Sequence, residues 1–130
     1  MSTAISPVLS TAEQAVALAS LSLHAVLTKR GITTIDCRKY LSISRAEMTA
    51  FFRQNPEKAE ALQLKKKEKK PVHDCLCMES RSGRFVVYDM DHGKERWLYW
   101  YTELPEAATD FVAFHYGYGY PDGYGFKKEG

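Results

Sequence analysis

Three side chains able to bind a metal ion alternate near the middle of the chain. His73, Cys75 and Cys77 are separated by single residues, so on a β-strand all three would point to one face. Imidazole and thiolate groups are common zinc ligands, and Cys37 or His92 could supply a fourth. Structural zinc sites more often use two-residue spacers, however, and the sequence has neither a CxxC nor an HxxxH pair. We therefore expect buried thiols beside a surface histidine, and we predict no metal or other cofactor.

Motifs of the common hydrolases and nucleotide-binding enzymes are absent from the sequence. It contains no GxSxG, no phosphate-binding loop and no HExxH. Asp74, Asp89 and Asp91 could form an acid–base pair, but only in a pocket that shifted their pKa values. We therefore do not expect the protein to be an enzyme.

Residues 33–53, TTIDCRKYLSISRAEMTAFFR, predict two short helices joined by a sharp turn. Each helix has a capping residue followed three positions later by an acidic residue, and these pairs are Thr33 with Asp36 and Ser44 with Glu47. The shared apolar seam would be formed by Cys37, Leu41, Ile43, Met48 and Phe51. The second helix would present to solvent Arg45, Ala46, Thr49, Ala50 and Arg53.

This stretch resembles a helix-turn-helix DNA-binding motif, most closely over YLSISRAEMTAFFR. Ser42 and Arg38 stand where that motif usually has glycine and alanine. The resemblance implies that the second helix enters the major groove of double-stranded DNA, with Arg45, Thr49 and Arg53 reaching bases or flanking phosphates.

The resemblance implies further contacts around that helix. Ser44 would donate to a phosphate at the helix start, and Glu47 could accept from cytosine N4. Beyond the motif, the lysine run KKKEKK includes Lys65, Lys66 and Lys67, which would neutralise phosphates without reading sequence. The alternatives are an ordinary helical hairpin for residues 33–53 and a solvated helix end for the lysine run.

Charge is unevenly distributed along the chain, although the net charge is only +2. Residues 1–70 contain 12 Lys and Arg against 6 Asp and Glu, net +6, whereas residues 71–130 contain 6 against 10, net −4. A basic half followed by an acidic half suggests two different roles. We therefore distinguish a basic helical region, residues 1–70, from a second region, residues 71–130, which could still share one compact domain with the first.

Residue periodicity predicts helices in the first region and strands in the second. Apolar residues at helical spacing predict one long helix between Ser10 and Gly31, and Asn55-Pro56 predicts another helix start. Residues 72–79, 84–91 and 95–102 predict a three-stranded antiparallel meander, and residues 104–114 predict a final helix. The expected fold is α+β, with an N-terminal helical bundle containing the helix-turn-helix, then the meander and the C-terminal helix.

Aromatic residues gather in the second region. Trp97, Tyr99 and Tyr101 share one face of the third predicted strand, and Tyr118 and Tyr120 lie in the segment HYGYGYPDGYGFKKEG. Aromatic side chains offer large contact areas to another protein, so these are the predicted partner-binding residues. An edge strand or a loose tail is the alternative for the glycine-rich segment.

The favoured function is a small DNA-binding transcriptional regulator of phage or bacterial type, for which a homodimer on a palindromic site is one option. The alternative is a protein-binding inhibitor, immunity or adaptor protein that uses the aromatic sheet. The three cysteines have no disulfide-framework spacing. With no apolar run long enough for a membrane span and no signal peptide, the sequence predicts a cytoplasmic protein without a membrane partner.

Overall fold

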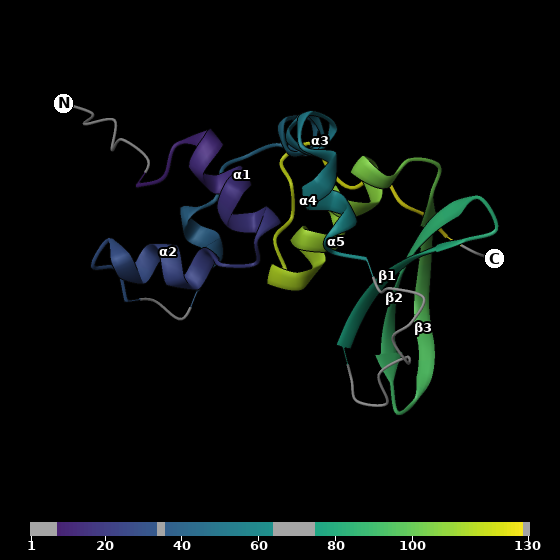
Figure 1. The fold of residues 1–130 in the computed structure, drawn as a ribbon. Helices are drawn as coiled ribbons and strands as arrows, with labels where there is room; N and C mark the ends of the chain where they lie inside the picture. Colours follow the sequence, from purple (N-terminus) through teal and green to yellow (C-terminus); the bar gives the residue numbers. More distant parts are fainter. Residues whose placement is uncertain (1–7, 34–35, 64–74, 129–130) are drawn as a thin grey trace.

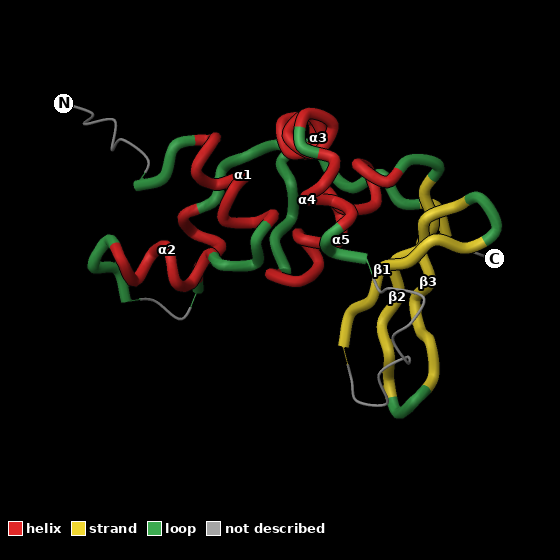
Figure 2. Tube along the Cα trace, in the orientation of Figure 1, coloured by secondary structure: helices red, strands yellow, loops and turns green. Residues whose placement is uncertain are grey.

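The structure, a computed structural model, describes residues 8–33, 36–63 and 75–128. It is an α+β fold in which helix α5 lies between the N-terminal helices and an antiparallel sheet (Figures 1 and 2). The helices are α1 (Thr11–Ala19), α2 (Leu23–Lys29), a 3-10 helix (Cys37–Tyr40), α3 (Arg45–Gln54), α4 (Pro56–Glu60) and α5 (Leu104–Tyr116). The strands are β1 (Cys75–Arg81), β2 (Arg84–Asp91), β3 (Lys94–Tyr101) and β4 (Lys127–Lys128). The predicted fold class is confirmed.

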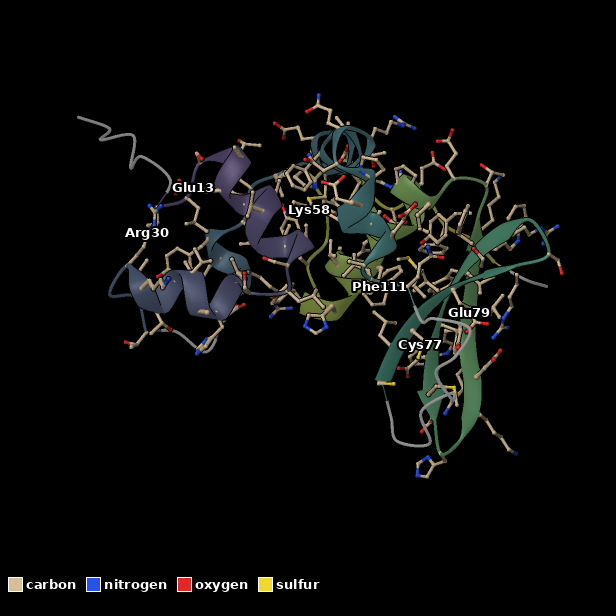
Figure 3. The ribbon with its side chains drawn as sticks, in the orientation of Figure 1. Glu13, Arg30, Lys58, Cys77, Glu79 and Phe111 are labelled. Carbon is tan, nitrogen blue, oxygen red and sulfur yellow. The ribbon has the colours of Figure 1, made fainter. Side chains whose placement is uncertain are left out.

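The single N-terminal helix predicted from periodicity is wrong, because the chain turns at Ser20-Leu21-Ser22. The amides of Leu21 and Ser22 donate back to the carbonyls of Leu18 and Ala17, at 3.1 and 2.9 Å. This is the Schellman pattern that ends many helices, with Leu21 in the left-handed conformation at φ 53°. Serine hydroxyls favour such an ending, since they compete for backbone groups. An ion pair between Arg30 and Glu13 then links α2 to α1 (Figure 3).

Capping boxes begin both α1 and α3, and the predicted cap of Ser44 and Glu47 is confirmed. Ser10 and Glu13 form a capping box at α1, and Ser44 and Glu47 form one at α3. In each box the serine hydroxyl accepts from the glutamate amide at 3.1 Å. The local sequence therefore decides where these helices begin.

The first of the two helices predicted within residues 33–53 is only one turn of 3-10 helix. Its N-cap is Asp36 rather than Thr33, and its chain is already extended at Leu41. The next residues are held by a side chain from α1, since Oε1 of the buried Gln14 accepts from the amides of Ser42 and Ile43 at 2.8 and 2.9 Å. A tertiary contact thus replaces the predicted helical turn.

The predicted meander is confirmed, with strand order β1-β2-β3-β4 and antiparallel pairing throughout. Its hairpins close with the two-residue loops Ser82-Gly83 and His92-Gly93, in which every residue has a positive φ. That backbone is the type I′ turn, whose twist suits two-residue hairpins. The register between β2 and β3 shifts after Val87, and Trp97 lies in this β-bulge with φ 51°.

One hydrophobic core crosses the boundary between the two predicted regions. Buried side chains of α1 and α3, including Leu18 and Phe52, belong to the same cluster as Met78 and Val87 of the sheet. Phe111 of α5 joins this cluster (Figure 3). The opposite face of the sheet forms a smaller cluster of Cys77, Val86, Tyr88 and Met90. Within the described residues, none of the helices combines the length and hydropathy needed to cross a membrane.

Replacement of Gln14 by Leu tests the contact that orders the segment before α3. The change removes the acceptor of two backbone amides, and each orphaned amide costs roughly 1–3 kcal/mol when buried. We expect a lower free energy of unfolding in urea for Gln14→Leu. Gln54→Leu, at an exposed position of α3, is the control and should change stability little. Equal effects of the two substitutions would contradict the assigned role of Gln14.

Candidate functional site

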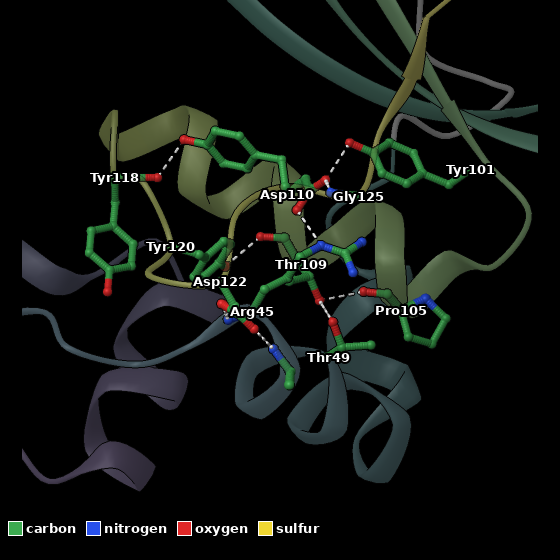
Figure 4. Close-up of polar contacts among 12 residues, drawn as sticks. Arg45, Thr49, Tyr101, Pro105, Thr109, Asp110, Tyr118, Tyr120, Asp122 and Gly125 are labelled. Atoms are coloured by element: carbon green, nitrogen blue, oxygen red, sulfur yellow. Dashed lines mark hydrogen bonds and ion pairs between the residues drawn. The ribbon is translucent and has the colours of Figure 1, made fainter.

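The structure directs Arg45, the first predicted base-contacting residue, inward. Its Nε donates to Oδ1 of Asp110 at 3.0 Å, and the two side chains are 18% and 0% exposed (Figure 4). Asp110 also accepts from the Tyr101 hydroxyl and the Gly125 amide, both at 2.9 Å. The predicted exposure of Arg45 is therefore wrong, because a fully buried carboxylate on α5 requires a cationic partner.

Thr49, the second predicted base-contacting residue, is also buried, with 4% exposure. Its hydroxyl lies 2.9 Å from that of Thr109 on α5, which donates to the Pro105 carbonyl at 2.7 Å (Figure 4). Arg45 and Thr49 are one helical turn apart, so both lie on the face of α3 that packs against α5. The predicted exposure is therefore wrong for Arg45 and Thr49, whereas Ala46, Ala50 and Arg53 are exposed as predicted.

A carboxylate of the protein itself occupies the N-terminus of α3, where Ser44 was predicted to bind a phosphate. Asp122 accepts from the backbone amides of Arg45 and Ala46 at 2.6 and 3.0 Å (Figure 4). These amide donors lower the pKa of Asp122 below its ordinary value. A helix N-terminus attracts anions, and here the glycine-rich segment supplies the anion.

The remaining predicted DNA-binding residues differ in their surroundings. Glu47 is exposed, and its carboxylate accepts from the Ser44 amide in the capping box of α3. Arg53 is exposed and pairs with Glu103 at 2.9 Å. Lys65, Lys66 and Lys67 lie outside the described residues.

Three of the tyrosines predicted to bind a partner are buried. Tyr101, Tyr118 and Tyr120 are 1%, 7% and 5% exposed. The hydroxyl groups of Tyr118 and Tyr120 donate to the Ile43 and Thr109 carbonyls at 2.8 and 2.6 Å. Burial raises the pKa of all three hydroxyls. These three side chains are buried because the segment after α5 folds back onto the helices, and their binding of a partner stays a prediction.

Of the cysteines, Cys77 is buried as expected, whereas Cys37 and Cys75 are partly exposed. The sulfur atoms of Cys75 and Cys77 lie 3.6 Å apart, and burial raises the pKa of Cys77 to about 12. Cys37 lies elsewhere, with its sulfur 3.9 Å from Nδ1 of His24. His73 falls outside the described residues, and within them no three His, Cys, Asp or Glu side chains form a metal-binding group.

The described residues instead enclose an open cleft between the sheet and the C-terminal end of α5. We call it the Trp97 cleft. Its volume is about 490 Å³, within the range of ligand sites. The lining residues are Leu76, Val87, Asp89, Trp97, Tyr99, Phe114, His115, Gly117 and Tyr124. Trp97 and Tyr99 are thus the two predicted partner-binding residues that border a cavity.

Aromatic rings from three separate segments form the cleft wall. Tyr99 of β3 lies 5.5 Å from Phe114 of α5, and Phe114 lies 4.8 Å from Tyr124 of the C-terminal segment, measured between ring centroids. Phe126 stacks behind Tyr99 at 4.2 Å. The wall is therefore held by packing on several sides.

Trp97 differs from the other rings because it is 65% exposed. It lies in the β-bulge of β3, in the hairpin of β2 and β3 that projects beyond the helices (Figure 1). Its left-handed φ costs a non-glycine residue roughly 1–2 kcal/mol. Alternation along the strand placed Trp97 and Tyr99 on one face, but the sequence contained no signal for Phe114, Tyr124 or Asp89 as their neighbours.

Comparison with known proteins adds no further information on this site. No protein-family model, curated protein or solved structure matches the chain. The cleft must therefore be judged on its own geometry and chemistry.

Two arginines of α3 should contribute very differently to stability. Arg45→Met would leave Asp110 buried without its cation, and removing one partner of such a pair costs about 3–5 kcal/mol. Arg53→Met removes an exposed pair, which typically contributes less than about 1 kcal/mol. We expect urea unfolding to show a large loss for Arg45→Met and a small one for Arg53→Met. Equal small losses would contradict the inward role of Arg45.

Asp122→Asn should alter the pH dependence of stability. Because the folded pKa of Asp122 is lowered, its charge stabilises the fold above the unfolded pKa of about 3.9. That contribution disappears as pH falls through the folded pKa. We expect Asp122→Asn to lower stability at neutral pH, by about 1 kcal/mol if it resembles loss of a helix cap. The difference from wild type should vanish in acid, as measured by thermal unfolding across pH, and a constant difference would contradict this role.

Proposed function

We propose that this protein binds another protein through the Trp97 cleft. The observation that carries the proposal is the exposed Trp97 side chain at the edge of a cavity lined by Tyr99, Phe114 and Tyr124. Tryptophan and tyrosine dominate the binding energy of protein interfaces when a pocket surrounds them. An extended polypeptide segment can place one side chain in the cleft and cover Trp97 with its neighbours.

The backbone at Trp97 supports the same proposal. A residue held at φ 51° within a β-bulge is strained, and bulges commonly redirect a side chain beside a functional site. The packing of Tyr99 against Phe126 and Phe114 keeps the opposite wall in place. A preformed cavity reduces the entropy lost when a partner binds.

The hypothesis of DNA binding stays a prediction with fewer residues to support it. Its remaining supports are the net charge of +6 over residues 1–70 and the exposed Arg53. Arg45 and Thr49 contact α5 and cannot reach a groove without disrupting that packing. A salt-dependent mobility shift with duplex DNA, weakened by Arg53→Ala and unchanged by Trp97→Gly, would favour this second function.

Trp97→Gly offers a sharp test of the proposed protein-binding function. Glycine adopts a positive φ without strain, so the variant should fold with stability equal to or above wild type. We expect peptides selected from a phage-displayed random library on the wild-type protein to lose most of their affinity for Trp97→Gly, measured by calorimetry. Val16→Ala, which trims an exposed apolar residue on α1 (48% exposed), is the control. Selected peptides that bind Trp97→Gly as tightly as wild type would overturn the proposal.

A further inference from the structure

Among the described residues, Asp89 is the one carboxylate that lines the Trp97 cleft. The other carboxylates of the described strands are occupied by arginines. Arg81 pairs with Glu79 at 2.6 Å and with Glu95 at 2.5 Å, and Arg96 pairs with Asp91. In the part of the chain that the structure describes, the half-buried Asp89 side chain has neither an ion pair nor a hydrogen bond. It therefore offers to whatever enters the cleft a carboxylate that has no ion pair among the described residues.

The aromatic wall of the cleft also favours a cationic ligand. The faces of aromatic rings carry partial negative charge and attract cations within about 6 Å of the ring centre. Trp97, Tyr99, Phe114 and Tyr124 all border the cavity that contains Asp89. The Trp97 ring already shows this attraction, since the guanidinium of Arg96 lies 5.5 Å from its centroid.

A ligand side chain without charge is disfavoured beside Asp89 and the aromatic rings. An apolar side chain that filled the cleft would remove water from Asp89 and leave its charge without a partner, which is unfavourable. A cationic side chain with an aliphatic stem avoids that loss. Its methylene groups contact the rings, while its head group meets the carboxylate.

We infer that the Trp97 cleft recognises a lysine or arginine side chain of the partner protein, held between the aromatic wall and the Asp89 carboxylate. This inference rests on the proposed function and specifies its ligand. Charge complementarity supports it, because residues 71–130 carry a net charge of −4. Arg96 lies opposite Asp89 in the register of β2 and β3, but its guanidinium pairs with Asp91, so the Asp89 carboxylate has no ion pair with it.

The direct test compares two probes that differ in charge but share a backbone and a similar chain length. Nα-acetyl-lysine methylamide and Nα-acetyl-norleucine methylamide are titrated into the full chain and followed by amide chemical shifts in NMR. We expect the lysine probe to shift cleft residues and to bind about tenfold more tightly than the norleucine probe. Asp89→Asn should remove most of this preference while leaving the fold unchanged. Equal binding of both probes, or a preference that persists in Asp89→Asn, would overturn the inference.

The library selection separates failure of this inference from failure of the proposed function. Enriched peptides that require both Trp97 and a conserved Lys or Arg, and that weaken at least about fivefold with Asp89→Asn, would support the inference. Peptides that require Trp97 but contain no basic residue would overturn the inference and leave the proposed function standing. Peptides that bind Trp97→Gly as tightly as wild type would overturn both the inference and the proposed function. Glu106→Gln, at a half-buried carboxylate of α5 outside the cleft lining, is the matched charge control and should change none of these affinities.

Discussion

The buried carboxylate of Asp110 is the constraint on which the arrangement of this protein depends. It lies on α5, is fully buried, and receives groups from three other parts of the chain: Arg45 of α3, Tyr101 of β3 and Gly125 of the C-terminal segment. A buried charge is tolerated only when it is paired and hydrogen-bonded. Satisfying Asp110 therefore fixes α3, the sheet and the C-terminal segment relative to α5.

The C-terminal segment completes this arrangement through two small contacts. Asp122 caps α3, and the Gly125 backbone passes so close to Arg45 that a Cβ atom at residue 125 would lie 2.2 Å from Nη2 of Arg45. The same passage positions Tyr124 and Phe126 against Phe114 and Tyr99. The polar network around Asp110 and the aromatic wall of the Trp97 cleft are thus built by one stretch of chain. This connection explains how a cavity at the surface obtains a rigid wall.

Several elements followed from local sequence alone. The capping boxes of Ser10 and Ser44 begin their helices, and the Ser82-Gly83 and His92-Gly93 pairs close their hairpins, because capping and type I′ turns depend on residues within a few positions. Alternation also predicted Trp97 and Tyr99 on one face, and both line the cleft although the β-bulge at Trp97 interrupts the alternation. These local rules predicted the α+β class and the meander. They did not predict which residues of other segments would lie beside Trp97 and Tyr99.

What the sequence by itself determined was therefore the start of each capped helix, the hairpins and the facing of the strand residues. Tertiary structure decided the rest. A helix presents arginine and threonine to solvent or to a neighbour depending on what packs beside it, and nothing near Arg45 in the sequence reveals Asp110, which is 65 residues away. The break at Leu21, the burial of Tyr118 and Tyr120, and the meeting of Asp89 with Trp97 and Phe114 likewise depend on contacts between distant segments. Such contacts arise only when the whole chain minimises its exposed apolar surface and its unpaired buried charge.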